Sequence, residues 1–171
     1  MKNLETKAKF QDIEKAESLF KQLGAKKVKT MRQIDTYFNV PSGRLKLRTF
    51  NPADSELIFY ERKENSNQRW SNYYTFHITK PKNFIEFLQK ALPIKVVVDK
   101  IRTLYRYKNA RIHLDKVAKL GGFVEIEVEV NKGDAQAKKL MRELLAFLKI
   151  PQKNFIKKSY SDLLLAKGKS A

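Results

Sequence analysis

Segments in which charged and apolar side chains alternate constrain the fold of this chain more than any other feature of its sequence. The clearest lies at residues 123–130, where Glu125, Glu127 and Glu129 alternate with apolar residues. Successive side chains of a β-strand point to opposite faces, so this pattern predicts a strand with one charged and one apolar face. Similar alternation predicts strands within residues 3–10, 43–49, 57–63, 96–105 and 110–117.

Between these segments, apolar residues recur at the spacing of one helix face. Gly24 and Pro93 follow two of these stretches, and both residue types commonly end helices. Amphipathic helices bury their apolar stripe, and the apolar faces of the predicted strands are the available partner. The pattern predicts helices over residues 12–23, 81–92, 134–148 and 154–166.

The charges on the predicted strands are segregated by sign. An ordinary half-buried sheet would also alternate, but its solvated face usually mixes both signs with neutral polar residues. If the helices cover the apolar face from outside, the charged face turns inward. We therefore expect an α+β fold, a closed antiparallel β-barrel of about eight strands with a charged lumen and helices packed outside. Basic residues gather at 44–48, 62, 69, 100, 102 and 111, and acidic residues at 125–129.

Composition limits what such a lumen can bind. The 171 residues include 36 Lys and Arg but 18 Asp and Glu, a formal net charge of +18 that favours anionic ligands. The chain has no Cys and two His, which excludes disulfides and thiol chemistry and argues against a His-rich zinc site. Nucleic acid, a membrane surface and a small polyphosphate are the anions to be distinguished.

Length and the absence of a long linker predict one domain over residues 1–171. No apolar run is long enough to span a bilayer, and the first ten residues contain no apolar signal core. We therefore expect a cytoplasmic monomer or homodimer with no membrane partner. Its basic exterior would give at most weak, non-specific binding to nucleic acid.

The order of these segments resembles the CYTH family, also called triphosphate tunnel metalloenzymes. Residues 3–7, Asn-Leu-Glu-Thr-Lys, stand where the family carries a Glu-x-Glu-x-Lys strand. The likeness runs from residue 3 to about residue 165 and is nearest to the branch of class IV adenylyl cyclases and thiamine triphosphatases. Further blocks similar to the family's strands and closing helix lie at residues 33–38, 43–48, 57–62, 100–105, 111–115, 120–127 and 158–164.

The resemblance implies a tunnel in which basic side chains bind the phosphates of a small triphosphate, such as tripolyphosphate, thiamine triphosphate or ATP. Arginine suits this task because its guanidinium group binds phosphate oxygens bidentately. The phosphate-binding set would be Lys7, Arg44, Lys46, Arg48, Arg62, Arg69, Lys100, Arg102 and Arg111.

The resemblance also implies a Mg²⁺ or Mn²⁺ cofactor held by Glu5, Glu125 and Glu127. Without a cation these carboxylates would repel the triphosphate, and Mg²⁺ is usually held by one or two carboxylates together with substrate phosphates. The catalytic residues would be Lys7, Glu5 and Glu127, with Lys7 or a metal-activated water as the general base. Further lumen residues would be Asn3, Asp35, His113, Asp115 and Glu129.

One residue departs from the family pattern. Asn3 occupies the first acidic position of the N-terminal motif, and its amide offers a hard cation a weaker ligand than a carboxylate. This difference leaves open whether the site holds one metal ion or two.

The same site supports two reactions, because phosphoryl transfer needs mainly positioning and charge neutralisation. Attack by water on the γ-phosphorus gives a triphosphatase, which is the reading we favour. Attack by a ribose 3′-hydroxyl on the α-phosphorus, with loss of pyrophosphate, gives an adenylyl cyclase. A third alternative is a non-catalytic binder of polyphosphate or nucleic acid.

Overall fold

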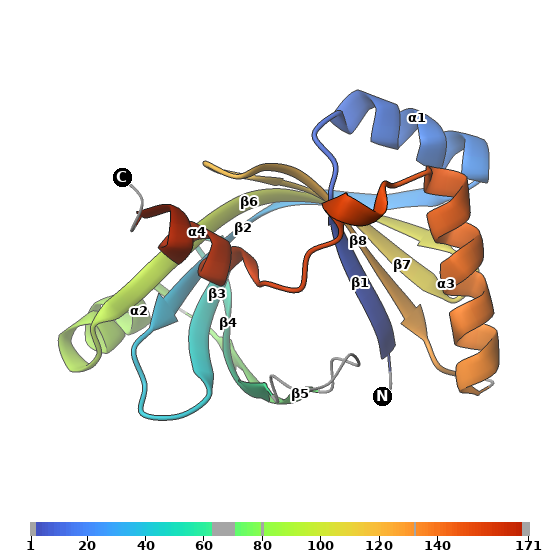
Figure 1. The fold of residues 1–171 in the computed structure, drawn as a ribbon. Helices are drawn as coiled ribbons and strands as arrows, with labels where there is room; N and C mark the ends of the chain where they lie inside the picture. The colour runs from blue at the N-terminus through green and yellow to red at the C-terminus, as the bar shows by residue number, and fades with distance from the viewer. Residues whose placement is uncertain (1–2, 63–70, 80, 132, 169–171) are drawn as a thin grey trace. The chain divides into compact units, whose positions relative to one another are not determined.

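The computed structural model describes residues 3–62, 71–79, 81–131 and 133–168, and the side chains of residues 62, 71–73 and 81 lie outside the description. Eight strands and four α-helices follow one another along the chain (Figure 1). In order, they are β1 (Asn3–Lys9), α1 (Ile13–Leu23), β2 (Lys26–Phe38), β3 (Arg44–Asn51), β4 (Asp54–Arg62), β5 (Ser71–Ile78), α2 (Pro81–Ala91), β6 (Ile94–Tyr107), β7 (Ala110–Val117), β8 (Gly121–Glu129), α3 (Asp134–Leu148), a 3-10 turn (Gln152–Asn154) and α4 (Tyr160–Gly168).

The strands form one sheet in the order β1-β8-β7-β6-β2-β3-β4-β5. The pairs β1–β8, β2–β3, β3–β4, β4–β5 and β7–β8 are antiparallel. The predicted fold class, α+β with eight antiparallel strands and accompanying helices, is therefore confirmed. Closure of the sheet into a barrel stays a prediction.

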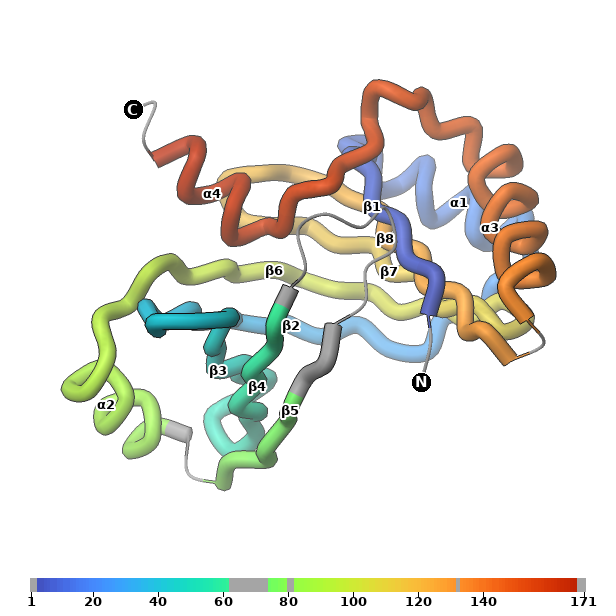
Figure 2. The backbone as a smooth tube through the Cα atoms, turned by 60° about the horizontal axis from the view of Figure 1, so that its bottom comes forward, coloured from blue at the N-terminus to red at the C-terminus, as the bar shows by residue number. Residues whose placement is uncertain are grey.

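The chain divides into two compact units. Unit 1 comprises Met1–Thr30 and Ile101–Lys158, and unit 2 comprises Met31–Lys100 and Ser159–Ala171. The division passes through β2 and β6, the two long strands that Figure 2 shows side by side. The expectation of a single domain over residues 1–171 stays a prediction.

In unit 1 the apolar face of β1, β7 and β8 packs against α1 and α3, which Figures 1 and 2 show next to each other. Ile112 and Ile126 of the sheet are 0% and 1% exposed, and Leu144 of α3 is 1% exposed. The Phe20 ring of α1 meets Tyr105 of β6 edge to face, with ring centroids 4.9 Å apart. Helices thus cover the apolar face, as the alternating pattern predicted.

Helix α1 has the boundaries that the sequence predicted. Asp12 caps its start by accepting a hydrogen bond of 2.9 Å from the backbone amide of Lys15. Gly24 ends it in the left-handed conformation, at φ 77°, and its amide bonds to carbonyls of the last turn. A glycine adopts this conformation without the steric cost that a Cβ would add.

Unit 2 has a smaller core of its own. Phe38 of β2, Leu47 of β3 and Leu88 of α2 are buried at its centre. Flanking apolar residues from β3, β4, β5, α2 and the turn after α2 complete it, namely Leu45, Leu57, Ile78, Phe84, Ile85 and Leu92. The helix predicted over residues 81–92 therefore exists and packs as expected.

Two elements differ from the sequence prediction. The last helix was expected over residues 154–166 but begins at Tyr160, because Ser159 and Asp162 form a capping box. Phe155 instead forms an isolated bridge with Ala8 of β1. Strand β5 was not predicted individually, although Tyr74, Phe76 and Ile78 alternate with Thr75 and His77 in the sequence. In the structure Tyr74 and Phe76 are 64% and 62% exposed. None of the helices in the described segments has the length and apolar character needed to span a membrane.

We predict that Ile126→Ala lowers the free energy of unfolding by about 2–5 kcal/mol, because it removes packed methyl groups from the core of unit 1. Ile101→Ala is the matched control, since Ile101 is also a strand isoleucine but is 50% exposed. Denaturant titration of both variants measures the difference. Equal losses would contradict the assignment of this core.

Candidate functional site

The register of unit 1 places charged side chains together on the face opposite its core. Across β1 and β8, Lys7 pairs with Glu125 and Glu5 with Glu127. Across β7 and β8, His113 pairs with Glu125. Directly opposed residues in antiparallel strands share a face, so the predicted charged face is real and extends over three strands.

Glu125 lies at the centre of this face and is only 6% exposed. Lys7 Nζ lies 2.9 Å from its Oε1, and Arg102 Nη2 donates to its Oε2 at 2.7 Å. Burial alone would raise the pKa of Glu125, but Lys7 and Arg102 hold it well below its usual range. Glu125 is therefore a carboxylate, and Glu5 also interacts with its side chain.

Arg102 is fixed from a second direction by Asp115, whose side chain is 0% exposed. Arg102 Nε and Nη2 donate to the two oxygens of Asp115 at 2.7 and 2.6 Å. This bidentate geometry is the strong form of an Arg–carboxylate pair. It locks the guanidinium group between Asp115 and Glu125.

Arg111 contacts two further carboxylates of the same face, those of Glu127 and Glu129. Its Nε and Nη2 lie 3.0 and 2.8 Å from Glu127 Oε2, and its Nη1 lies 3.9 Å from Glu129. The second oxygen of Glu127, Oε1, points towards His113 at 3.6 Å. Asn3 stands opposite Glu129 in the register, at the end of this face.

We call the linked residues Glu5, Lys7, Arg102, Arg111, His113, Asp115, Glu125, Glu127 and Glu129 the Glu125 cluster. With every carboxyl group counted as ionised and His113 as neutral, its three basic side chains and five carboxyl groups give a formal charge of −2. The hydrogen bond between Glu5 and Glu125 needs a proton on one of these two groups. Lys9 and Arg106 share the face by alternation but are exposed at its margins. A divalent cation would balance the cluster, and its carboxylates are the ligands that Mg²⁺ and Mn²⁺ take.

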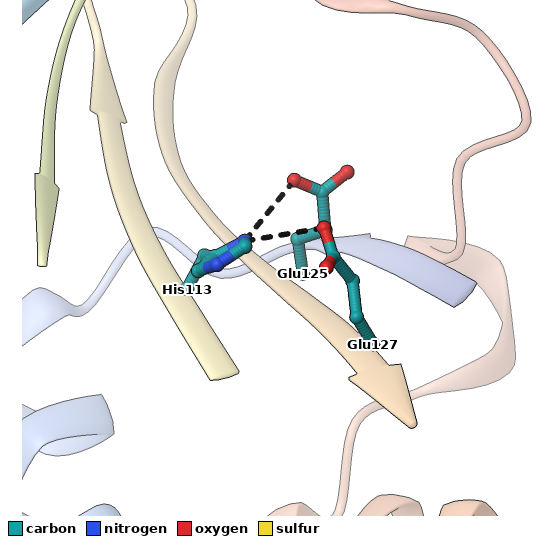
Figure 3. Close-up of side chains that lie close together, drawn as sticks. All are labelled: His113, Glu125 and Glu127. Carbon is teal, nitrogen blue, oxygen red and sulfur yellow. Dashed lines mark ion pairs between the residues drawn. The ribbon is translucent and has the colours of Figure 1, made fainter. Parts of the chain in front are cut away.

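Three side chains of this cluster bring potential ligand atoms together. His113, Glu125 and Glu127 each offer one atom, and the three atoms lie within 4.8 Å of one another (Figure 3). This donor set fits a divalent cation. It contains two of the three ligands expected from the sequence, and Glu5 as a ligand stays a prediction.

Unit 2 carries a second charged cluster, centred on Asp35, with the opposite balance. Lys46 Nζ lies 2.9 Å from Asp35 Oδ2, and Arg48 donates to both oxygens at 2.7 and 2.8 Å. Burial would raise the pKa of Asp35, but Lys46, Arg48 and the charge of Lys100 hold it well below its usual range. This Asp35 cluster of one carboxylate and three basic side chains has a formal charge of +2 and therefore favours an anion.

Aromatic rings hold the lysines of the Asp35 cluster. Lys46 Nζ lies 5.4 Å from the ring centroid of Tyr37 and 6.0 Å from that of Tyr60. Lys100 Nζ lies 5.3 Å from that of Tyr160 in α4. Cation–π contacts of this kind attract an ammonium group without adding a negative charge, so they leave the formal charge of the cluster unchanged.

Arg44 connects the sheet of unit 2 to the start of α4. It donates to Ser159 Oγ at 2.8 Å, and its Nη2 lies 3.1 Å from Asp162 Oδ1. Ser159 and Asp162 are also the capping box of that helix. Arg44, which the sequence predicted to bind phosphate, thus also holds the start of α4 in place.

The predicted site residues divide between the two units. Unit 1 contains Asn3, Glu5, Lys7, Arg102, Arg111, His113, Asp115, Glu125, Glu127 and Glu129, and unit 2 contains Asp35, Arg44, Lys46, Arg48 and Lys100. Arg62 is the last residue of β4, but its side chain lies outside the description, as does all of Arg69. That the basic residues converge on one elongated site stays a prediction.

Sequence reasoning missed the aromatic and capping residues of unit 2. Tyr37, Tyr60 and Tyr160 gave no signal, because an aromatic residue in a strand or helix is usually core. Ser159 and Asp162 did carry a signal: the Ser-x-x-Asp spacing is that of a capping box. It correctly marks the start of α4.

Comparison with known proteins identifies the family. The family model of the CYTH domain matches residues 1–160. A Methanocaldococcus jannaschii protein named "Putative adenylate cyclase" is 30% identical over 177 residues, which cover 95% of this chain and 98% of the relative. The chain therefore belongs to the CYTH family.

Solved structures share the fold. A Pyrococcus horikoshii protein superposes with a TM-score of 0.82 and 26% identity, covering 94% of this chain and 98% of the other. A Vibrio parahaemolyticus protein, whose description is also that of an adenylate cyclase candidate, superposes with a TM-score of 0.74 and 19% identity, covering 96% and 98%. The resemblance found in the sequence is confirmed over nearly the whole chain.

We predict that Asp35→Asn destabilises the protein by about 3–5 kcal/mol, because it leaves the buried Lys46 and Arg48 without their shared carboxylate. Asp99→Asn is the matched control: Asp99 pairs bidentately with Arg32, but that pair is largely exposed. The control should change stability little. Similar losses in the two variants would contradict the structural importance of the Asp35 cluster.

The same carboxylates set the acid stability. Asp35 and Glu125 have folded-state pKa values well below the reference values of 3.8 and 4.5. Their stabilising contribution is complete above the unfolded-state pKa values and is lost as pH falls through the folded-state ones. Unfolding free energy should therefore be steady between about pH 5 and 7 and fall steeply below about pH 4. In Asp35→Asn the fall should be shallower.

Proposed function

We propose that this CYTH protein is a Mg²⁺- or Mn²⁺-dependent triphosphatase that acts on a small triphosphate. The observation that carries the proposal is the pairing of a cluster with a formal charge of −2 and another with a formal charge of +2 in one chain of this family. The first suits a divalent cation and the second an anion. A triphosphate hydrolase needs both.

The residues present have distinct parts in the proposed reaction. Lys46, Arg48 and Lys100 would bind phosphate oxygens, together with the remaining predicted basic residues Lys7, Arg44, Arg62, Arg69, Arg102 and Arg111. Glu125 and Glu127 would hold the cation, with Glu5 as a further acidic residue. When bound, the cation would neutralise charge on the phosphate oxygens.

The bond changes of hydrolysis are simple. Water attacks the γ-phosphorus, and the bond from that phosphorus to the bridging oxygen breaks. The two products are orthophosphate and the shortened phosphate chain.

We place the protein in the cytoplasm, where such substrates and Mg²⁺ occur together. The general base, for which Lys7 was named, stays a prediction.

A second candidate reaction is favoured by the relatives. The M. jannaschii relative carries the name of an adenylate cyclase, and it is similar over nearly the full length of both chains. In that reaction the ribose 3′-hydroxyl attacks the α-phosphorus and pyrophosphate leaves. The same two clusters would serve it, so the products decide between the two reactions.

The deciding assay supplies tripolyphosphate, thiamine triphosphate or ATP with Mg²⁺ or Mn²⁺ and quantifies orthophosphate, pyrophosphate and cyclic AMP separately. Orthophosphate from tripolyphosphate supports the triphosphatase. Cyclic AMP with equimolar pyrophosphate supports the cyclase. Tight tripolyphosphate binding without any product would identify a non-catalytic binder and contradict both.

We predict that Glu127→Gln abolishes metal-dependent turnover while tripolyphosphate binding is kept or tightened. The substitution preserves shape and removes one negative charge from a metal-ligand position next to the anion. Glu129→Gln is the matched control and should reduce turnover far less, because Glu129 lies 3.9 Å from Arg111 and outside the group of converging ligand atoms. Equal Mn²⁺ affinity in wild type and Glu127→Gln, measured by calorimetry, would defeat the assignment.

Arg48→Ala should weaken tripolyphosphate binding by roughly 1.5–3 kcal/mol, the range for hydrogen bonds to charged groups. Arg102→Ala should weaken it by a similar amount if Arg102 also reaches the substrate. Arg142→Ala on the exposed face of α3 is the control and should have no effect. Losses below about 0.3 kcal/mol in both test variants would remove these residues from the phosphate site.

A further inference from the structure

The imidazole ring of His113 is buried among charged groups and is unused by the proposed reaction. Its side chain is 8% exposed and projects from β7 towards Glu125 and Glu127 of β8 (Figure 3). The other histidine of the chain, His77 on β5, has a side chain that is 64% exposed. The two histidines therefore differ sharply in environment.

The ring nitrogen of His113 lies at ion-pair distance from two carboxylates but makes no well-formed hydrogen bond to either. Its Nδ1 is 3.6 Å from Glu125 Oε2 and 3.6 Å from Glu127 Oε1, too far for a good hydrogen bond. Among the described residues, this buried nitrogen has no hydrogen-bond partner. A buried polar atom in that state costs free energy and indicates a missing partner.

The spacing around this nitrogen suits a metal ion. Donor atoms at about 2.0–2.2 Å from a divalent cation lie about 3–3.5 Å from one another at adjacent positions. The ligand atoms of His113, Glu125 and Glu127 lie within 4.8 Å of one another, and the two distances from Nδ1 are 3.6 Å. An inward movement of these side chains by a few tenths of an ångström would complete such a set.

We propose that His113 Nδ1 is the third protein ligand of the cation, and that it makes the site prefer Mn²⁺ to Mg²⁺. This inference rests on the proposed metal-dependent function. Mg²⁺ takes oxygen ligands almost exclusively. Mn²⁺ shares its affinity for carboxylate oxygens but, as a transition metal, also accepts an imidazole nitrogen in a mixed site. A nitrogen donor among carboxylates therefore discriminates between the two ions.

The register explains why this nitrogen is available. His113 is directly opposite Glu125, and Glu127 follows two residues later on the same face of β8. Glu125 keeps its Oε1 for Lys7, and Glu127 keeps its Oε2 for Arg111, while the other oxygen of each faces His113. Arg102 also binds Glu125 Oε2, so the cation would share that oxygen with it.

The test uses the intact protein with ¹⁵N-labelled histidine and Mn²⁺ as the probe. Electron spin-echo modulation of bound Mn²⁺ reports a directly ligated nitrogen, and its frequency changes when that nitrogen is ¹⁵N. We expect a histidine coupling in wild type that His77→Asn keeps and His113→Asn loses. Calorimetry should show the preference for Mn²⁺ over Mg²⁺ reduced about tenfold in His113→Asn and unchanged in His77→Asn.

The outcomes separate this inference from the proposed function. Mn²⁺ binding to wild type with no histidine coupling would overturn the inference, even if triphosphate turnover is found. A histidine coupling without turnover would support the inference and contradict the function. An absent coupling in wild type overturns the inference without any variant. A coupling that His77→Asn keeps assigns it to His113, the other histidine of the chain, even if His113→Asn folds poorly.

Discussion

The buried ion pairs on the charged face of the sheet are the interaction on which the rest of the structure depends. Charged groups removed from water are costly unless they are paired and fully hydrogen-bonded. Asp115, at 0% exposure, is matched by the bidentate Arg102, and Asp35, at 3%, by Lys46 and Arg48. These pairs allow carboxylates and basic groups to remain charged at positions where other proteins place a hydrocarbon core.

The balance of formal charge differs between the two clusters. The Glu125 cluster has two more negative than positive groups, and the Asp35 cluster has two more positive than negative ones. Each excess suits one component of a metal–triphosphate complex. Replacing buried ion pairs by packed apolar residues is often neutral or stabilising. Stability alone therefore does not explain why this face is charged, whereas binding of a metal–triphosphate complex does.

Much of this fold was readable from local patterns. Alternation at Glu125, Glu127 and Glu129 correctly predicted strand β8 and its charged face, and helical spacing located α1, α2 and α3. Strand β5 was missed although Tyr74 and Phe76 alternate with polar residues, because it lacks the alternating Lys, Arg and Glu residues that marked the predicted strands. The start of α4 depends on a capping box, which side-chain hydrogen bonds determine rather than hydrophobic periodicity.

The contacts within the site were less predictable than the elements, because the sequence of one strand does not determine which residues of another strand lie opposite it. The sequence predicted Lys7 and Glu125 as site residues, but their contact follows from the β1–β8 register. His113 looked like one lumen residue among several, and only the β7–β8 register places it opposite Glu125. Residue types indicated the chemistry, while long-range pairing decides which groups meet.

Crystals grown with Mn²⁺ and tripolyphosphate would test the central claim most directly, through anomalous scattering at the manganese edge. The charge distribution predicts a manganese peak among His113, Glu125 and Glu127, with phosphate density on Lys46, Arg48 and Lys100. A manganese peak elsewhere, or phosphate bound without any contact to the Asp35 cluster, would contradict the division of charge between the two clusters.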